Sequence, residues 1–279
     1  MQLSRFSLFV AFTSTIAGAL AAPLNSTLTT RAAAQVITKC TVPNTVAITF
    51  DDVSPYLCCT VPNTVAITFD DGPYEYIYDI SNALINAGAK GTFFFNGNNY
   101  QCIYSADNQA RLKHVYKQGH QVASHTWGHK DLSTDLSTLT WDQVHDEMWR
   151  VEEALQRILG VTPAFMRPPF GSYNGKRTHL LPSEYYLTLT SADNVRNVAG
   201  VRGQKIANWD FDSRDSAGAS AADSKRLYDE IIAQRPSTIL TLNHETYRTT
   251  ALVTLAECLG EQAYQYIGSP QTPDDSWTC

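Results

Sequence analysis

The chain has 279 residues, of which 43% are hydrophobic, 17% charged and 11% aromatic, so it can bury a substantial core in one or two domains. Its formal net charge is −6 and it carries no basic stripe, which excludes a typical nucleic-acid-binding protein. An acidic surface suits a neutral or weakly cationic substrate better than an anionic polymer.

The first 21 residues have the layout of a secretory signal peptide. A basic start precedes an apolar run at 6–20, and small residues favour cleavage after Ala21. A membrane anchor is the alternative, but polar residues at 13–15 interrupt the run, and no other stretch is long and apolar enough to span a bilayer. Residues 22–39 are interpreted as a leader that carries a glycosylation sequon. We therefore expect a secreted protein, extracellular or in the cell wall.

Beyond the leader, apolar strands alternate with helices. The run at 64–69 ends in Asp-Asp-Gly-Pro, as expected for a buried strand that enters a turn. Thr140 and Gln143 form a capping box at the start of a long helix. Strands are predicted at 64–69, 90–96, 121–124, 164–167, 204–211 and 238–242, and helices at 76–87, 108–118, 140–160 and 224–234. This alternation predicts a parallel α/β fold, and the number of units favours a single-domain barrel over an open sheet.

Polar residues stand where these predicted strands end. In barrels of parallel strands, catalytic residues lie at the carboxyl ends of the strands. The polar residues at the predicted ends are Asp70, Asp71, His125, Arg167, Asp212 and His244. Their common position predicts one shared site.

Two of these motifs suggest metal chemistry. Side chains of adjacent residues at a strand end diverge, so one carboxylate of Asp70 and Asp71 can bind a metal while the other accepts a proton. A turn or a helix cap is the alternative for this pair. His125 and His129 are four residues apart, as metal binding on one helical turn requires, although a solvated pair has the same spacing. With Asp71 they form a His-His-Asp set that leaves a position on zinc open for water.

Three further residues have both a functional and a structural interpretation. Arg167 can hold a neighbouring aspartate ionised and oriented, or lie in a surface turn, since Pro-Pro and Gly follow it. Trp209 can flank a sugar ring or pack in the core. His244 follows an apolar strand, where a histidine can also be structural.

The motifs TFDDG, SHTWGH, RPPFG, WDFDSRD and LTLNH occur in this order. They resemble the five motifs of NodB-like polysaccharide deacetylases, carbohydrate esterase family four, and are most similar to those of secreted fungal chitin deacetylases. The resemblance covers residues 59–268, which form the expected deacetylase domain, followed by a tail at 269–279. It implies a distorted (β/α) barrel with one divalent metal, Zn²⁺ or alternatively Co²⁺.

The resemblance also implies roles for the matching residues. Asp71, His125 and His129 would be the metal ligands. Asp70 would be the general base toward the attacking water, and Arg167 would tune it.

On the leaving-group side, His244 would protonate the sugar amine as general acid, and Asp215 would tune it. The backbone N–H of Phe170 would help to bind the developing oxyanion. Trp209 and Leu242 would line the substrate groove.

The implied activity is hydrolysis of N-acetyl groups from N-acetylglucosamine units of chitin or chitooligosaccharides, by a monomer, with release of acetate. Related deacetylases act on acetylxylan or peptidoglycan, and the motifs do not separate these substrates. Two competing hypotheses are a non-catalytic wall-binding protein with a decayed barrel and a product that does not fold. No nucleic-acid partner is expected, and no membrane partner after cleavage of the signal peptide.

The stretch CTVPNTVAITFDD occurs twice, at 40–52 and at 59–71. Only the second copy continues into Gly-Pro and a predicted helix, so Asp70 and Asp71 are assigned to the site. The first copy continues into Val53, which lacks the conformational freedom of glycine at a tight turn. Residues 40–58 are therefore interpreted as a duplicated insertion.

The chain departs from the family pattern at two other places. Residues 175–191 have no recognised counterpart, and the helix that usually follows the last motif is expected to be missing. Val53-Ser54 and Gly175-Lys176 are what in-frame intron starts would encode, which leads to the hypothesis of retained introns. Sequencing of the transcript tests this hypothesis.

The chain has six cysteines, and an even number in an exported protein favours disulfides over metal thiolates. Without the duplicated insertion, an even set of four remains. The family resemblance suggests a disulfide between Cys59 and Cys258.

Overall fold

The structure is a computed structural model that describes residues 32–39, 65–132, 139–173, 191–236 and 239–251. The strands are β1 Val36–Ile37, β2 Val65–Ala66, β3 Thr68–Gly72, β4 Thr92–Phe95, β5 Gln121–Ser124, β6 Phe165–Met166, β7 Lys205–Ala207, β8 Phe211–Asp212 and β9 Ile239–His244. The helices are α1 Ile77–Asn86, α2 Ala106–Lys117, α3 Trp141–Leu159, α4 Ser191–Arg202 and α5 Ala221–Ala233, with a 3₁₀ turn η1 at Pro169–Gly171.

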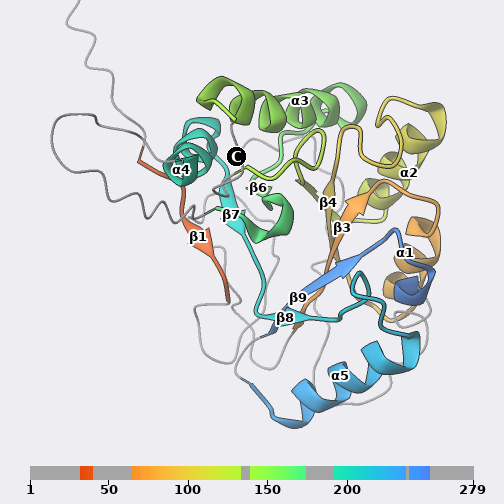
Figure 1. The fold of residues 1–279 in the computed structure, drawn as a ribbon. Coiled ribbons are helices and arrows are strands. Elements are labelled where there is room, and N and C mark those ends of the chain that lie inside the picture. Colours follow the sequence, from red (N-terminus) through yellow and green to blue (C-terminus); the bar gives the residue numbers. More distant parts are fainter. Residues whose placement is uncertain (1–31, 40–64, 133–138, 174–190, 237–238, 252–279) are drawn as a thin grey trace, which may run out of the picture. The chain divides into compact units, whose positions relative to one another are not determined.

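The described strands form one parallel sheet in the order β1-β7-β6-β5-β4-β3-β9-β2, and β8 pairs with β9 beside this path. Because every pair is parallel, the carboxyl ends of the strands lie along one edge. Figure 1 shows the helices arranged around these strands. The predicted alternation of strands and helices is confirmed.

The second copy of the duplicated stretch supplies β2 and β3. Its residues pair with β9 on one side, where Asp70 lies opposite His244, and with β4 on the other side. The predicted context of the second copy, a strand followed by a helix, is therefore found in β3 and α1. The first copy lies outside the described residues.

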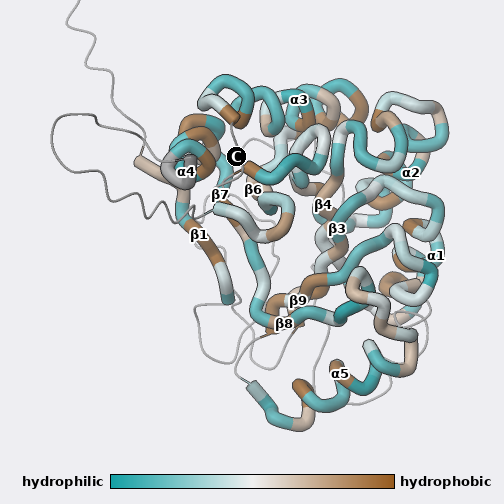
Figure 2. Tube along the Cα trace, viewed as in Figure 1, coloured by the Kyte–Doolittle hydropathy of each residue, from teal (hydrophilic) through white to brown (hydrophobic). Residues whose placement is uncertain are grey.

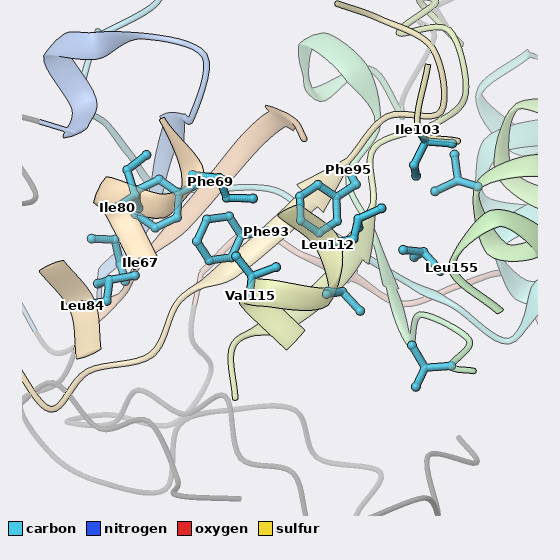
Figure 3. Packing of buried hydrophobic residues seen from close by; sticks show 14 of the residues in the cluster. Ile67, Phe69, Ile80, Leu84, Phe93, Phe95, Ile103, Leu112, Val115 and Leu155 are labelled. Carbon is cyan, nitrogen blue, oxygen red and sulfur yellow. The ribbon is translucent and has the colours of Figure 1, made fainter. Parts of the chain in front are cut away.

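Alternate strand residues face two different cores because successive side chains of a strand point to opposite faces. Phe69, Phe93 and Phe95 are fully buried and meet residues of α1, α2 and α3 on one face (Figure 3). Each such side chain stabilises the fold by about 1.5–3 kcal/mol. Phe94 and Phe165 belong to a second cluster on the opposite, inner face of the sheet.

The distribution of hydrophobic residues agrees with this packing of helices on a central sheet. Hydrophobic residues follow β1, β4 and β9, whereas α3 and α5 are largely hydrophilic (Figure 2). The apolar residues of α5, Ile231 and Ile232, pack against the buried Val65 and Ile239. None of the helices within the described residues is long and apolar enough to cross a membrane.

Two elements between residues 191 and 212 differ from the sequence prediction. The strand predicted at 204–211 is two short strands, β7 and β8. Helix α4 was not predicted, although its buried residues Val195, Val198 and Ala199 follow helical spacing. These residues form a third cluster with Met148 of α3. The signal was weak because the apolar stripe of α4 is short and the helix includes a glycine.

Val36 and Ile37 form strand β1 of the sheet, whereas the sequence analysis assigned them to the leader. Ile37 is buried, and the strand pairs with β7. Gly200 of α4 allows this approach, because a Cβ there would lie 2.4 Å from the carbonyl oxygen of Ala32. The packed fold therefore includes residues before the boundary at residue 59.

Several sequence predictions concern residues that the structure does not describe. These are the first copy of the repeat, residues 175–190, and every cysteine except Cys102, so the predicted Cys59–Cys258 disulfide stays a prediction. Cys102 is an exposed thiol. Residues 248–251 are helical, in the region where the usual helix was expected to be missing, and the residues after them are outside the described part.

Candidate active site

The candidate site lies at the carboxyl ends of β3, β5, β6 and β9. On the inner face, each strand carries an apolar or hydroxyl residue two positions before a polar one. The pairs are Thr68 and Asp70, Ala123 and His125, Phe165 and Arg167, and Leu242 and His244. The two-residue period of a strand therefore turns all four polar side chains toward the same interior.

Asp71, His125 and His129 lie together as the sequence predicted. Asp71 Oδ1 is 3.5 Å from His125 Nε2 and 3.2 Å from His129 Nε2. The three candidate ligand atoms are all within 4.8 Å of one another. Ligands about 2.0–2.1 Å from a tetrahedral zinc are themselves about 3.3 Å apart, so this set fits such an ion.

The surroundings of His125 prepare its Nε2 as a ligand. Its Nδ1 lies 2.8 Å from the carbonyl oxygen of Arg167, so Nδ1 carries the proton and Nε2 presents its lone pair. Burial lowers the pKa of His125 to about 3, against an opposing effect of the Asp71 charge. The imidazole is therefore neutral at neutral pH, as a metal ligand must be.

Asp71 supplies independent support for a cation. Its Oδ1 is buried and has no hydrogen-bond partner among the described residues. Buried polar atoms are almost always satisfied, and a buried carboxylate oxygen without a donor is costly. A divalent cation between Asp71 and the two histidines would satisfy this atom.

Backbone conformation explains how neighbouring residues reach one site. Asp71, Thr126, His129 and Phe170 have positive φ angles of 74°, 70°, 52° and 60°. Such left-handed conformations cost about 1–3 kcal/mol each in residues other than glycine and cluster at functional sites. Strand alternation alone would direct Asp70 and Asp71 to opposite faces, and the left-handed turn at Asp71 brings both to the same site.

Asp70 is held by Arg167, which is fully buried. Arg167 Nη1 donates to Asp70 Oδ1 at 2.8 Å and to Thr68 Oγ1 at 2.6 Å, and its other nitrogens donate to the carbonyls of Ala207 and Asn208. Burial raises the pKa of Asp70, while the Arg167 and His244 charges lower it, and the net direction is upward. From the sequence only the lowering effect of Arg167 was expected, because residue order gives no measure of burial.

His244 and Asp215 form a second pair. His244 Nδ1 lies 2.8 Å from Asp215 Oδ1, and Asp215 Oδ2 accepts from the His244 backbone N–H and from Thr250 Oγ1, both at 2.6 Å. Burial lowers the pKa of His244, but the hydrogen bond and charge of Asp215 outweigh it and raise the pKa to about 9. His244 is therefore protonated at neutral pH.

The predicted groove residues border the same centre. Phe170 is 67% exposed, and the centre of its ring lies 4.9 Å from that of the His129 ring. Trp209 is half-buried, and the Arg167 guanidinium lies 5.6 Å from its ring centre. Leu242 is buried on the inner face two residues before His244.

Asp212, by contrast, is not brought to the site. Its side chain is exposed and accepts a hydrogen bond from the Arg214 backbone N–H, so it stabilises a turn. The aspartate of this motif that reaches the site is Asp215, three residues later. The strand-end pattern had pointed to Asp212, whereas the family resemblance had implied Asp215 as the partner of His244.

Sequence reasoning missed a buried glutamate beside the site. Glu245 is fully buried, its Oε1 accepts from the Tyr74 backbone N–H at 2.7 Å, and burial raises its pKa well above the usual value. A Cβ on Gly72 would lie 2.1 Å from this carboxyl group, which explains the glycine after the two aspartates. The adjacent His244 was the signal that could have drawn attention to Glu245.

Sequence reasoning also missed a cluster of three tyrosines, of which Tyr247 lies next to His244. The rings of Tyr74 and Tyr100 are 5.4 Å apart, and the Tyr247 ring is 6.0 Å from the His244 ring. The side chains of Tyr247 and Tyr100 are hydrogen-bonded. They come from loops after three different strands, so no local pattern joins them.

Comparison with known proteins agrees with this geometry. The family model described as polysaccharide deacetylase matches residues 58–183. A chitin deacetylase from Colletotrichum lindemuthianum is 31% identical over 233 residues, which are 81% of this chain and 83% of that protein. A chitin deacetylase from a Pestalotiopsis species is 37% identical over 165 residues, 58% of this chain, and the chain spans 47% of that relative.

The fold also matches a solved structure. The chitin deacetylase from the fungal pathogen Colletotrichum lindemuthianum aligns with a TM-score of 0.64 at 24% identity, over 85% of this chain and 90% of that chain. This match confirms the predicted distorted (β/α) barrel. From the sequence match to the Colletotrichum protein and the matching family model, the chain belongs to the polysaccharide deacetylase family.

Proposed function

We propose that this protein is a metal-dependent deacetylase that hydrolyses N-acetyl groups of N-acetylglucosamine units in chitin or chitooligosaccharides. The observation that carries the proposal is the convergence of Asp71, His125 and His129 at ligand distances, with Asp70 and His244 beside them. The names of the fungal relatives support chitin as the substrate class. A divalent cation held by the three ligands would act as a Lewis acid toward the acetyl carbonyl and lower the pKa of water.

Asp70 is the proposed general base. It takes a proton from the water that adds to the acetyl carbon, and its raised pKa makes it a better base than an ordinary carboxylate. Arg167 fixes one carboxylate oxygen, which leaves Oδ2 directed toward the ligand set, 3.7 Å from His125 Nε2.

His244 is the proposed general acid. As the bond between the acetyl carbon and the sugar nitrogen breaks, the imidazolium donates a proton to the nitrogen, and the products are acetate and a free amine. The backbone N–H of Phe170 is proposed to bind the oxyanion. Trp209, Leu242 and the cluster of Tyr74, Tyr100 and Tyr247 are proposed to contact the sugar.

The test is acetate release from soluble chitooligosaccharides, with and without a chelator. We expect release by the purified protein, loss of release after chelation, and recovery when Zn²⁺ or Co²⁺ is added back. Release that survives complete removal of metal contradicts the proposal. A folded protein that binds the polymer without releasing acetate indicates the non-catalytic alternative, and preference for acetylxylan or peptidoglycan corrects the substrate.

An Asp215→Asn variant is expected to change the pH dependence of kcat. Without the carboxylate that raises it, the pKa of His244 should fall from about 9 toward its ordinary value of 6.5. A general acid must be protonated, so the alkaline limb of the kcat profile should move to lower pH by the same amount. If the alkaline limb of the kcat profile lies at the same pH in this variant as in the wild type, His244 is not the general acid whose titration produces that limb.

We further propose secretion after removal of residues 1–21, a deacetylase domain at 59–268, Zn²⁺ as the resident metal, and a monomer. N-terminal sequencing of the secreted protein tests the cleavage site. Metal analysis of the same preparation tests the identity of the metal, and light scattering tests the monomer.

A further inference from the structure

The loop between the two histidine ligands is held by a glutamate of α3. Glu147 is buried, its Oε2 accepts from the Gly128 backbone N–H at 2.7 Å, and its Oε1 lies 2.8 Å from Lys130 Nζ. Its own carbonyl oxygen accepts from the Trp127 backbone N–H at 2.7 Å. One residue of α3 therefore binds the chain directly before and directly after His129.

This loop requires support because its backbone is strained. Thr126 and His129 both have left-handed conformations, which residues other than glycine rarely adopt. The His125 end of the loop is fixed independently, since its ring binds the Arg167 carbonyl and Asn96 Nδ2 donates to the carbonyls of His125 and Thr126.

The His129 end depends on different contacts. The His129 side chain is 21% exposed, whereas that of His125 is 3% exposed. Trp127 anchors the middle of the loop by filling the space above Gly97, where a Cβ would lie 1.9 Å from the indole. Between Trp127 and Lys130, the Glu147 carboxylate binds the backbone at Gly128, and the His129 side chain contacts Phe170 and Asp71.

We propose that Glu147 is a positioning residue for the metal centre. Its Oε2 holds the Gly128 backbone, and Oε1 adds a weaker contact with the exposed Lys130, so that His129 Nε2 stays 3.2 Å from Asp71 Oδ1. The inference rests on the proposed function, since it assumes that these ligands hold a metal. Residues that orient ligands in this way typically contribute 10–100-fold to metal affinity.

The same helix provides a matched control. Glu152 lies five residues after Glu147 on α3, is buried to the same extent, and pairs with Arg202 of α4. Its described contacts do not include the histidine loop. A Glu152→Met variant therefore removes a buried, paired carboxylate from α3 and leaves the loop contacts intact.

The experiment compares four variants of the full protein after the metal has been removed: E147M, E147Q, E147D and E152M. The dissociation constant for Zn²⁺ is measured by competition with a chromophoric chelator, and the coordination of Co²⁺ by its visible absorption spectrum. Thermal unfolding without metal reports the stability of each variant. None of these measurements depends on turnover.

E147M is expected to bind Zn²⁺ about 10–100-fold more weakly and to change the Co²⁺ spectrum. E147Q should stay within about fivefold of the wild type, because its amide oxygen still accepts from Gly128 and the pair with the 57% exposed Lys130 side chain is weak. E152M should unfold at lower temperature but bind Zn²⁺ with unchanged affinity. If E147M does not fold, E147D, whose carboxylate is withdrawn by one methylene, is expected to show the same loss in smaller degree.

Wild-type affinity in folded E147M, or in E147D when E147M does not fold, overturns the inference. An equal loss of affinity in E152M also overturns it, because the effect would then come from the stability of α3. A wild-type protein that binds no divalent cation overturns the proposed function together with the inference. If the wild type binds Zn²⁺ and the Glu147 variants bind it equally well, the inference is overturned but the proposed function is not.

Discussion

An Asp70→Asn variant is expected to lose about 10²–10⁴-fold in kcat while it still binds the divalent cation. Asp70 is outside the ligand set, because its Oδ1 accepts from Arg167 and its Oδ2 is 3.7 Å from His125 Nε2. An asparagine in this place cannot take a proton from water. Its amide oxygen can still accept from Arg167, so the arrangement of the site should be preserved.

The measurement is acetate release at saturating chitooligosaccharide, together with the metal content of the same sample. Asp71→Asn is the matched variant, because asparagine tolerates the left-handed conformation that Asp71 adopts, with φ of 74°. It removes the charge of a ligand, so metal affinity and activity should fall together. Near-normal turnover by Asp70→Asn would contradict the assignment of the base, and loss of metal from this variant would make Asp70 a ligand.

The second large expected effect is a loss of stability in a variant of Arg167. Arg167→Met is expected to lower the free energy of unfolding by about 3–5 kcal/mol, the cost of leaving a buried charge without its partner. The variant leaves Asp70 buried, and it also removes the donors to Thr68 and to the carbonyls of Ala207 and Asn208. Methionine fills much of the same volume beside Phe94, whose ring centre lies 4.3 Å from the guanidinium carbon, so a cavity contributes little.

The loss of stability in Arg167→Met should depend on pH. In this variant, burial still raises the pKa of Asp70, and the opposing effect of Arg167 is gone. An acid whose pKa is raised by folding binds more protons in the folded state, so stability is lost as the pH rises through the folded-state pKa. The difference in stability between variant and wild type should therefore narrow as the pH falls from neutral toward the ordinary pKa of an aspartate.

Denaturant unfolding of the wild type and of four variants checks this prediction: Arg167→Met, Asp70→Asn, the double variant and a surface control. Arg157→Met, which breaks a surface pair with Glu153, is the control and should change stability by less than about 1 kcal/mol. The double variant Asp70→Asn with Arg167→Met should be less destabilised than the sum of its parts, because both charges are gone. Equal effects of the two arginine substitutions would contradict the interpretation of Arg167 as the buried partner of Asp70.

The sequence by itself determined the features that depend on local chemistry. Apolar runs and capping residues predicted most helices and strands, because the period of burial and the satisfaction of end groups are local properties. The polar residues at strand ends predicted that Asp70, Asp71, His125, Arg167 and His244 lie together, since parallel strands share one carboxyl edge. The same pattern wrongly included Asp212, which lies exposed in a turn. The glycine and proline after the second copy of the repeat distinguished it from the first.

Only the tertiary structure decided how these residues meet. Whether Asp71 joins Asp70 depends on a left-handed turn at Asp71. Gly72, directly after it, packs against the carboxyl group of Glu245, which is far away in the chain. The raised pKa of Asp70 could not be predicted from the sequence, because it results from burial, which depends on the tertiary structure. The role of Glu147 depends on the approach of α3 to the histidine loop. Contacts of this kind join residues distant in sequence, and no local pattern of residues records them.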